Sequence, residues 1–123
     1  MDRENASIVA VIDDDDEVRD VLRVLLESAG HDVETFRSGP QFLEDAELDR
    51  MACIVVDQRM PRMTGLELLQ ELTRRGRQIP SLLITGMHDP QVDAAASRVG
   101  AMTVLEKPMS PQELLRFVQF TVG

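Results

Sequence analysis

The sequence predicts a doubly wound α/β fold, in which a five-stranded parallel sheet is covered by five helices. Short apolar runs alternate strictly with segments whose apolar residues recur at helical spacing. Four of the five runs are almost entirely apolar, as strands buried on both faces of a parallel sheet are. Strict alternation implies right-handed strand–helix–strand units, and hence helices on both faces. A chain of 123 residues fits one domain, so we expect residues 1–123 to form a single domain.

The apolar runs give the predicted strands in order along the chain. They are Ile8–Ile12, Val33–Phe36, Ala52–Val56, Ser81–Ile84 and Met102–Leu105. The run Val33–Phe36 mixes polar and apolar residues, which favours a position at the edge of the sheet.

The predicted helices lie between these runs and after the last one, and their ends are marked by capping residues. The expected stops are Gly30, Gly76 and Gly100. The expected N-terminal caps are Ser38, Thr64, Asp89 and Ser110. The segments that begin at Thr64 and Ser110 have Glu three residues later, as a capping box requires. Pro111 also fits the first helical position, where its missing N–H costs nothing.

The composition excludes several classes of function. With 13 basic against 22 acidic residues the net charge is −9, which argues against direct binding to nucleic acid or to anionic membranes. No apolar run reaches the length of a membrane span, and the N-terminal residues have no signal-peptide character. The single cysteine, Cys53, excludes an internal disulfide and fits a reducing compartment. We therefore expect a cytoplasmic protein.

Polar and charged residues follow four of the five predicted strands. The first strand ends in Asp13 and Asp14, the third in Asp57, the fourth in Thr85, and the fifth leads to Lys107. In an open α/β sheet ligands bind outside the carboxyl ends of the strands, so these side chains are expected to converge at one edge.

Such a cluster has a definite chemistry. Two carboxylates about 5 Å apart repel each other by roughly 3 kcal/mol at an effective dielectric constant near 20. Lys107 alone cannot neutralise three of them, and a hard divalent cation with oxygen ligands, Mg²⁺ above all, is the natural partner. A carboxylate can also attack phosphorus and form an acyl phosphate. The cation and Lys107 would then offset the charge on the phosphoryl oxygens, and Thr85 would donate a hydrogen bond to one of them.

Four segments of the chain resemble the signature segments of response-regulator receiver domains, in the same order. They are Val11–Asp15, Val56–Gly65, Leu83–Gly86 and Leu105–Pro108. The pattern Asp57-x-x-Met-Pro-x-Met-x-Gly, followed by Thr-Gly and Lys-Pro, is specific, and the resemblance covers essentially the whole chain. In its Arg-Met-Pro, Ile-Thr-Gly and Glu-Lys-Pro segments the chain resembles the FixJ-type transcriptional regulators. The resemblance implies the CheY-like version of the flavodoxin-like fold, with strand order 2-1-3-4-5.

The resemblance also implies roles for individual residues. Asp57 accepts a phosphoryl group from a phosphohistidine of a sensor histidine kinase in a Mg²⁺-dependent reaction. Asp14 binds Mg²⁺ directly, Asp13 binds it directly or through water, and the backbone carbonyl of Arg59 is a further ligand together with Asp57. Lys107 pairs with the phosphoryl group, its bond to Pro108 being cis, and Thr85 moves toward that group on activation. The domain is then a phosphoacceptor rather than an enzyme, and it binds no organic cofactor.

The resemblance extends to partners and to switching. An output domain, fused or separate, and a phosphorylation-dependent homodimer are the partners that it implies besides the kinase. Many receivers carry an aromatic residue three positions before the lysine, where this chain has Val104. Valine has no ring to swing inward and has few rotamers, so we expect backbone movement around Gly86–Asp89 to carry more of the signal.

Three other functions are open to a chain of this pattern. A pseudo-receiver would have the same fold and would signal by constitutive protein contacts, but such domains usually lose one of the acidic or lysine residues kept here. A phosphatase with an aspartyl nucleophile needs a second Asp two residues later, where Arg59 stands. A flavodoxin-like electron carrier needs a phosphate-binding loop after the first strand, where Asp13–Asp16 would repel a flavin phosphate.

Overall fold

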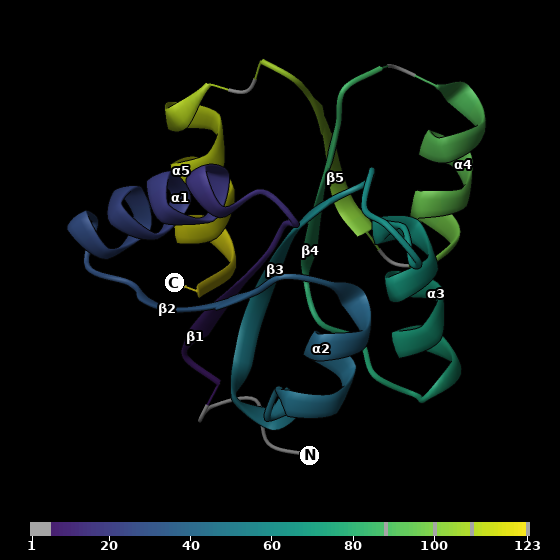
Figure 1. Ribbon diagram of the computed structural model, residues 1–123, viewed down its shortest axis with the longest axis horizontal. Coiled ribbons are helices and arrows are strands. Elements are labelled where there is room, and N and C mark those ends of the chain that lie inside the picture. Colours follow the sequence, from purple (N-terminus) through teal and green to yellow (C-terminus); the bar gives the residue numbers. More distant parts are fainter. Residues whose placement is uncertain (1–5, 88, 100, 109, 123) are drawn as a thin grey trace.

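A five-stranded parallel sheet forms the centre of the molecule. The computed structural model describes residues 6–87, 89–99, 101–108 and 110–122. The strands are β1 (Ile8–Ile12), β2 (Asp32–Phe36), β3 (Met51–Asp57), β4 (Ser81–Thr85) and β5 (Ala101–Glu106). Their order is β2-β1-β3-β4-β5 and every adjacent pair is parallel, which confirms the predicted fold class. Figure 1 shows the sheet at the centre with helices on either side.

Helices alternate with the strands along the chain, as predicted. They are α1 (Asp16–Ser28), α2 (Gly39–Asp45), α3 (Gly65–Arg74), α4 (Pro90–Arg98) and α5 (Pro111–Val122). A short 3-10 helix, η2 (Leu48–Arg50), precedes β3 and was not predicted. The hydrophobic faces of α1 and α5 pack on one side of the sheet, and those of α2, α3 and α4 pack on the other (Figure 1).

The two halves of the core are separated by the alternation of side chains along each strand. In β1, Ala10 and Ile12 face the helices α2 to α4, while Val9 and Val11 face α1 and α5. All four are completely buried, and β3 is buried along its whole length. Burying a valine or isoleucine side chain contributes on the order of 1.5–3 kcal/mol, so the central strands are firmly packed and give the residues that follow them a stable position.

The edge position of β2 also follows from its side chains. Asp32 and Glu34 are exposed, whereas Phe36 is buried and makes an edge-to-face contact with Phe42 of α2, with ring centroids 5.1 Å apart. These three side chains share one face of β2, which is exposed at Asp32 and Glu34 and packed at Phe36. The strand lies at the edge of the sheet, as the mixed pattern predicted.

Capping residues fix where the helices begin. Asp15 caps α1 by accepting from the backbone N–H of Glu17 at 2.9 Å, so the acidic run after Asp14 serves the helix N-terminus. Predicted caps are also found at Ser38, Thr64 and Asp89, and both halves of the capping box at Thr64 are present. At Ser110 the hydroxyl accepts from the N–H of Glu113 at 3.4 Å.

Two of the predicted helix stops adopt the backbone conformation that favours glycine. Gly30 has φ +94° and Gly76 has φ +76°, and a side chain is strained at such angles. The third, Gly100, lies outside the described residues. Within the described ranges, no helix combines the length and the apolar character needed to cross a membrane.

Candidate functional site

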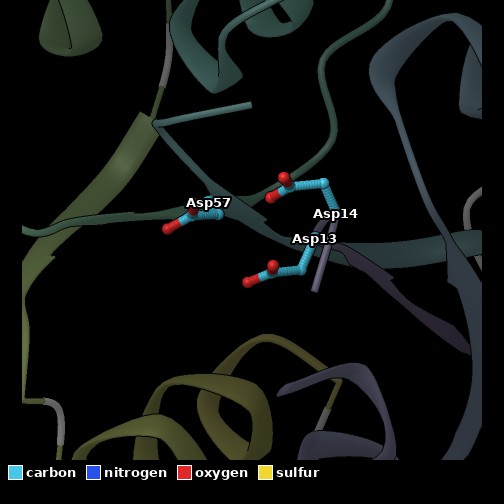
Figure 2. A group of neighbouring side chains, drawn as sticks. All are labelled: Asp13, Asp14 and Asp57. Atoms are coloured by element: carbon cyan, nitrogen blue, oxygen red, sulfur yellow. The ribbon is translucent and has the colours of Figure 1, made fainter. Parts of the chain in front are cut away.

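Three aspartates lie together at the carboxyl edge of the sheet. Asp13 follows β1 and Asp57 ends β3, and the pairing of Ile12 with Val56 places these two residues side by side. Each of Asp13, Asp14 and Asp57 offers a carboxylate oxygen, and these oxygens lie within 4.8 Å of one another. Figure 2 shows the three carboxylates extending in the same direction from the ends of their strands. This is the arrangement that the edge rule predicted.

The three carboxylates differ in their exposure to water. Asp13 and Asp57 are 4% and 5% exposed, whereas Asp14 is exposed. Burial raises the pKa of Asp13, because a charged carboxylate loses its hydration there. A hydrogen bond from the N–H of Asp15, 2.9 Å long, opposes the rise, and the charge of Asp57 adds to it. The site is thus a place where negative charge is costly in the absence of a cation.

Lys107 is the cation that this chain itself brings to the cluster. Its Nζ lies 2.9 Å from Oδ1 of Asp57, and its bond to Pro108 is cis. Burial by itself lowers the pKa of Lys107, but the hydrogen bond with Asp57 and the charges of Asp57, Asp13 and Asp14 outweigh it and raise the pKa. Lys107 is therefore held in its charged form beside Asp57.

Backbone hydrogen bonds bring β4 and β5 into register with the acidic cluster. Asp57 pairs with Ile84, and Thr85 pairs with Glu106, so Thr85 and Lys107 lie at the same edge as Asp57. The N–H of Lys107 donates to the carbonyl of Thr85 at 2.8 Å. Thr85 is buried, and its hydroxyl donates to the carbonyl of Met87 at 3.0 Å. The hydroxyl is therefore occupied by its own loop in this structure.

A cleft opens over these residues. It has a volume of about 440 Å³, and its lining includes the three aspartates, Lys107 and Arg59. A second cleft of about 350 Å³ lies beside it, with Arg59, Gly86 and Met87 common to both. The position expected to carry an aromatic ring, Val104, is partly buried and packs against the core on the side of α3 and α4.

Three residues near the cluster make contacts that were not predicted. Arg19 on α1 is buried and donates to the carbonyl of Asp13 at 2.6 Å as well as to Asp16. Gln58 accepts from the N–H of Leu66 through its side chain. Gly65 leaves no space for a Cβ, which would lie 2.6 Å from the carbonyl oxygen of Asp57. In the sequence, Gly65 is the glycine that ends the signature segment Val56–Gly65, whereas the contacts of Arg19 and Gln58 are marked by no motif.

The chain is similar to known proteins along nearly its whole length. The family described as "Response regulator receiver domain" matches residues 9–119. The transcriptional regulatory protein FixJ of Azorhizobium caulinodans is 43% identical over 116 residues, which cover 94% of this chain and 54% of that protein. TdiR of Thauera aromatica, also a transcriptional regulatory protein, is 43% identical over 112 residues, covering 90% and 49%.

Solved structures agree with this likeness. The structure of the response regulator StyR superimposes with a TM-score of 0.87 at 39% identity, covering 95% of this chain and 60% of that one. The chain spans about half the length of the curated relatives it matches.

Fold and site together define a CheY-like α/β domain with an acidic pocket at the carboxyl edge of its sheet. The chain belongs to the family of response regulator receiver domains. Receiver domains are the phosphoacceptor modules of two-component systems, so the chain is a component of phosphorelay signalling. The family binds Mg²⁺ at an acidic pocket, and the cluster of Asp13, Asp14 and Asp57 is the acidic pocket of this chain.

Proposed function

We propose that this chain accepts a phosphoryl group on Asp57 in a Mg²⁺-dependent reaction and signals by a change of its surface. One observation carries the proposal: a buried carboxylate, that of Asp57, lies between two further carboxylates and a charged lysine at the floor of an open cleft. A purely structural ion pair would not need Asp13 and Asp14 beside it, because their repulsion opposes folding.

The acidic cluster fits Mg²⁺ in its chemistry. Three carboxylates provide hard oxygen ligands, and the cleft is open enough for the waters that Mg²⁺ retains. The residues that would hold the ion are Asp13, Asp14 and Asp57, with the backbone carbonyl of Arg59 as a further ligand. When bound, the ion offsets the charge of the carboxylates and of the phosphoryl oxygens.

In the proposed phosphoryl transfer, Asp57, Lys107 and Thr85 each have a separate role. A carboxylate oxygen of Asp57 attacks phosphorus, and the bond from phosphorus to the donor breaks with its electron pair left on the donor. With a phosphohistidine of a sensor kinase, the donor leaves as a neutral imidazole when its other nitrogen carries a proton. Lys107 exchanges its contact with Asp57 for one with the phosphoryl oxygens, and Thr85 turns its hydroxyl from Met87 toward them.

The proposed phosphorylation of Asp57 also implies a location, partners and a place in a larger protein or complex for this chain. The chain would catalyse only its own phosphorylation and dephosphorylation, and it would act in the cytoplasm, where its kinase partner presents the phosphohistidine. We propose that residues 1–123 form one receiver domain whose output lies in a further domain, fused or separate. Its curated relatives are about twice as long, which supports this reading. Activation would also favour a homodimer through α4 and β5.

The first prediction concerns Asp57 itself. The chain contains no tryptophan, so phosphorylation is followed by intact mass rather than by fluorescence. Incubation with acetyl phosphate should give one phosphoryl adduct that requires Mg²⁺ and is absent in Asp57→Asn. A folded protein that takes up no phosphoryl group from acetyl phosphate or from a phosphorylated kinase would favour the pseudo-receiver instead.

A further inference from the structure

Gln58, the residue after Asp57, connects three elements at the site. Its N–H donates to the carbonyl of Ile84 on β4 at 2.7 Å, which continues the ladder between β3 and β4. Its carbonyl accepts from the N–H of Gly65 at 3.1 Å, and its side-chain Oε1 accepts from the N–H of Leu66 at 2.8 Å. Gln58 is thus joined to a neighbouring strand and, by two bonds, to the first turn of α3.

These bonds satisfy helix donors that would otherwise have no partner. The first N–H groups of a helix lack intrahelical acceptors. In α3 the N–H groups of Gly65 and Leu66 donate to Gln58, and that of Glu67 donates to the hydroxyl of Thr64. Thr64 is a local cap within the first turn, whereas Gln58 reaches across the loop of residues 59–64 to the end of β3. The two caps therefore serve the same helix but only one of them closes the loop.

The loop that Gln58 closes carries part of the proposed metal site. Arg59 begins this loop and lines the cleft above the aspartates. Arg62, within the loop, has φ +69°, a left-handed conformation that is unfavourable for a residue with a Cβ. A loop with such a residue needs attachments at both ends to keep its shape, and Gln58 supplies two of them.

We propose that Gln58 is a positioning residue that holds the backbone of the loop, and with it the carbonyl of Arg59, in the conformation that binds a divalent cation. This inference rests on the proposed Mg²⁺-dependent function. Without the side-chain acceptor, only a fraction of the molecules would hold the loop in place, and the apparent affinity for Mg²⁺ would fall by that fraction. One lost hydrogen bond lowers the ratio of held to released loop by roughly fivefold, so the affinity falls by up to that factor.

The test compares three variants by their affinity for Mg²⁺ alone. Gln58→Met keeps the length of the side chain and removes the acceptor, and Gln58→Glu keeps an acceptor at the same place. Thr64→Val removes the local cap of the same helix and is the matched control for loss of helix stability. Lys107 is the only lysine in the chain and lies beside Asp57, so ¹³C-labelled lysine gives a single side-chain NMR signal at the site. The shift of this signal during a Mg²⁺ titration gives the affinity without any phosphorylation reaction.

The expected result is a Mg²⁺ affinity weakened by up to roughly fivefold for Gln58→Met, with wild-type affinity or tighter for Gln58→Glu and an unchanged affinity for Thr64→Val. Hydrogen exchange of the Leu66 amide should become faster in Gln58→Met and stay slow in Gln58→Glu. Equal Mg²⁺ affinity in Gln58→Met and wild type, or an equal loss in Thr64→Val, would overturn the proposal.

A measurement on the wild type covers the case in which Gln58→Met does not fold. If Gln58 and the cation act on the same loop, Mg²⁺ must slow exchange of the Leu66 amide more than that of the Glu67 amide, because coupling between two sites is reciprocal. Equal slowing of both amides contradicts the inference. Wild-type protein that binds Mg²⁺ but gains no phosphoryl group would contradict the proposed function and leave the role of Gln58 standing.

Discussion

At the scale of single residues, the position of Asp57 depends on the absence of a side chain at Gly65. The first turn of α3 approaches the end of β3 so closely that a Cβ at Gly65 would lie 2.6 Å from the carbonyl oxygen of Asp57 and 2.7 Å from Cδ1 of Leu83. One of these contacts is with backbone, which cannot rotate away. A methyl group at this position must therefore displace either the helix or the strand that carries Asp57.

Gly65→Ala is therefore expected to be destabilised by about 1–3 kcal/mol, the usual cost of overpacking. The phosphorylation rate should fall as well, because the backbone of Asp57 shifts. Urea unfolding measures the first effect and adduct formation from acetyl phosphate the second. Gly86→Ala is the control for stability, since a Cβ at Gly86 would meet no atom within 4 Å. Equal stability of Gly65→Ala and wild type would show that a methyl group fits between α3 and β3 without moving either element.

Some residues of the site could be predicted from the sequence and others could not. Asp13, Asp14, Asp57 and Lys107 could be placed because each follows a predicted strand and parallel strands end at one edge. Arg19 and Gln58 could not, because their partners are backbone groups, the carbonyl of Asp13 and the N–H of Leu66. Such contacts depend on the path of a loop, which no residue pattern specifies.

At the scale of elements, α3 combines a strong N-terminal cap with an ion-pair cluster near its C-terminal end. Glu71 accepts from Arg74 at 2.6 Å and from Arg75 at 2.8 Å. Hydrogen bonds to Arg74 and then to Arg75 lower the pKa of Glu71 to about 2. Because the pKa is depressed in the folded state, the stabilisation is present above the ordinary value of 4.5 and is lost as pH falls toward 2.

The corresponding variant is Glu71→Gln, which should be less stable than wild type at neutral pH. The difference should narrow as pH falls below 4.5 and be lost only as pH falls through about 2, where Glu71 becomes protonated in the folded state. It should also shrink in high salt, because the three side chains are near the surface. Urea unfolding across this pH range is the measurement. A difference that is constant with pH would assign the effect to something other than the charge of Glu71.

Elements were more predictable than their boundaries. All five strands were predicted, because each is a short run with apolar residues that is separated from the next by a segment of helical pattern. At their carboxyl ends three strands extend one residue further than predicted, to Asp57, Thr85 and Glu106, since polar residues at the end of a strand still pair through their backbone. The 3-10 helix η2 was missed because three residues are too short to show a period. Its N-cap residue, Glu47, makes no side-chain capping hydrogen bond that could have marked its start.

At the scale of the whole molecule, the acidic site opposes folding, and a bound cation would offset this effect. The net charge is −9, and burial raises the pKa of Asp13, so the charged form of Asp13 costs stability at neutral pH. A ligand that binds only the folded state adds stability in proportion to the logarithm of its concentration, about 2.7 kcal/mol at about a hundred times its Kd. Folding and cation binding are thus linked through one cluster.

Asp13→Asn separates these two effects. Without Mg²⁺ the variant should be more stable than wild type at neutral pH, because its side chain carries no charge and still accepts from the N–H of Asp15. With Mg²⁺ the order should reverse, because wild type gains stability and the variant gains little. Thermal unfolding at several Mg²⁺ concentrations decides between these outcomes. A variant that is less stable than wild type in the absence of Mg²⁺ would mean that burial of the charge is not the dominant effect.

The backbone ladders continue past the last strand residues and into the site. Gln58 donates to Ile84 directly after Asp57, and Lys107 donates to Thr85 directly after β5. The residues that would carry out the chemistry are therefore anchored through peptide hydrogen bonds at or next to them, and these bonds would oppose sliding of the strands if a phosphoryl group were added to Asp57 as proposed. The proposed phosphorylation is therefore expected to change the loops and helices that leave this edge of the sheet rather than the positions of its strands.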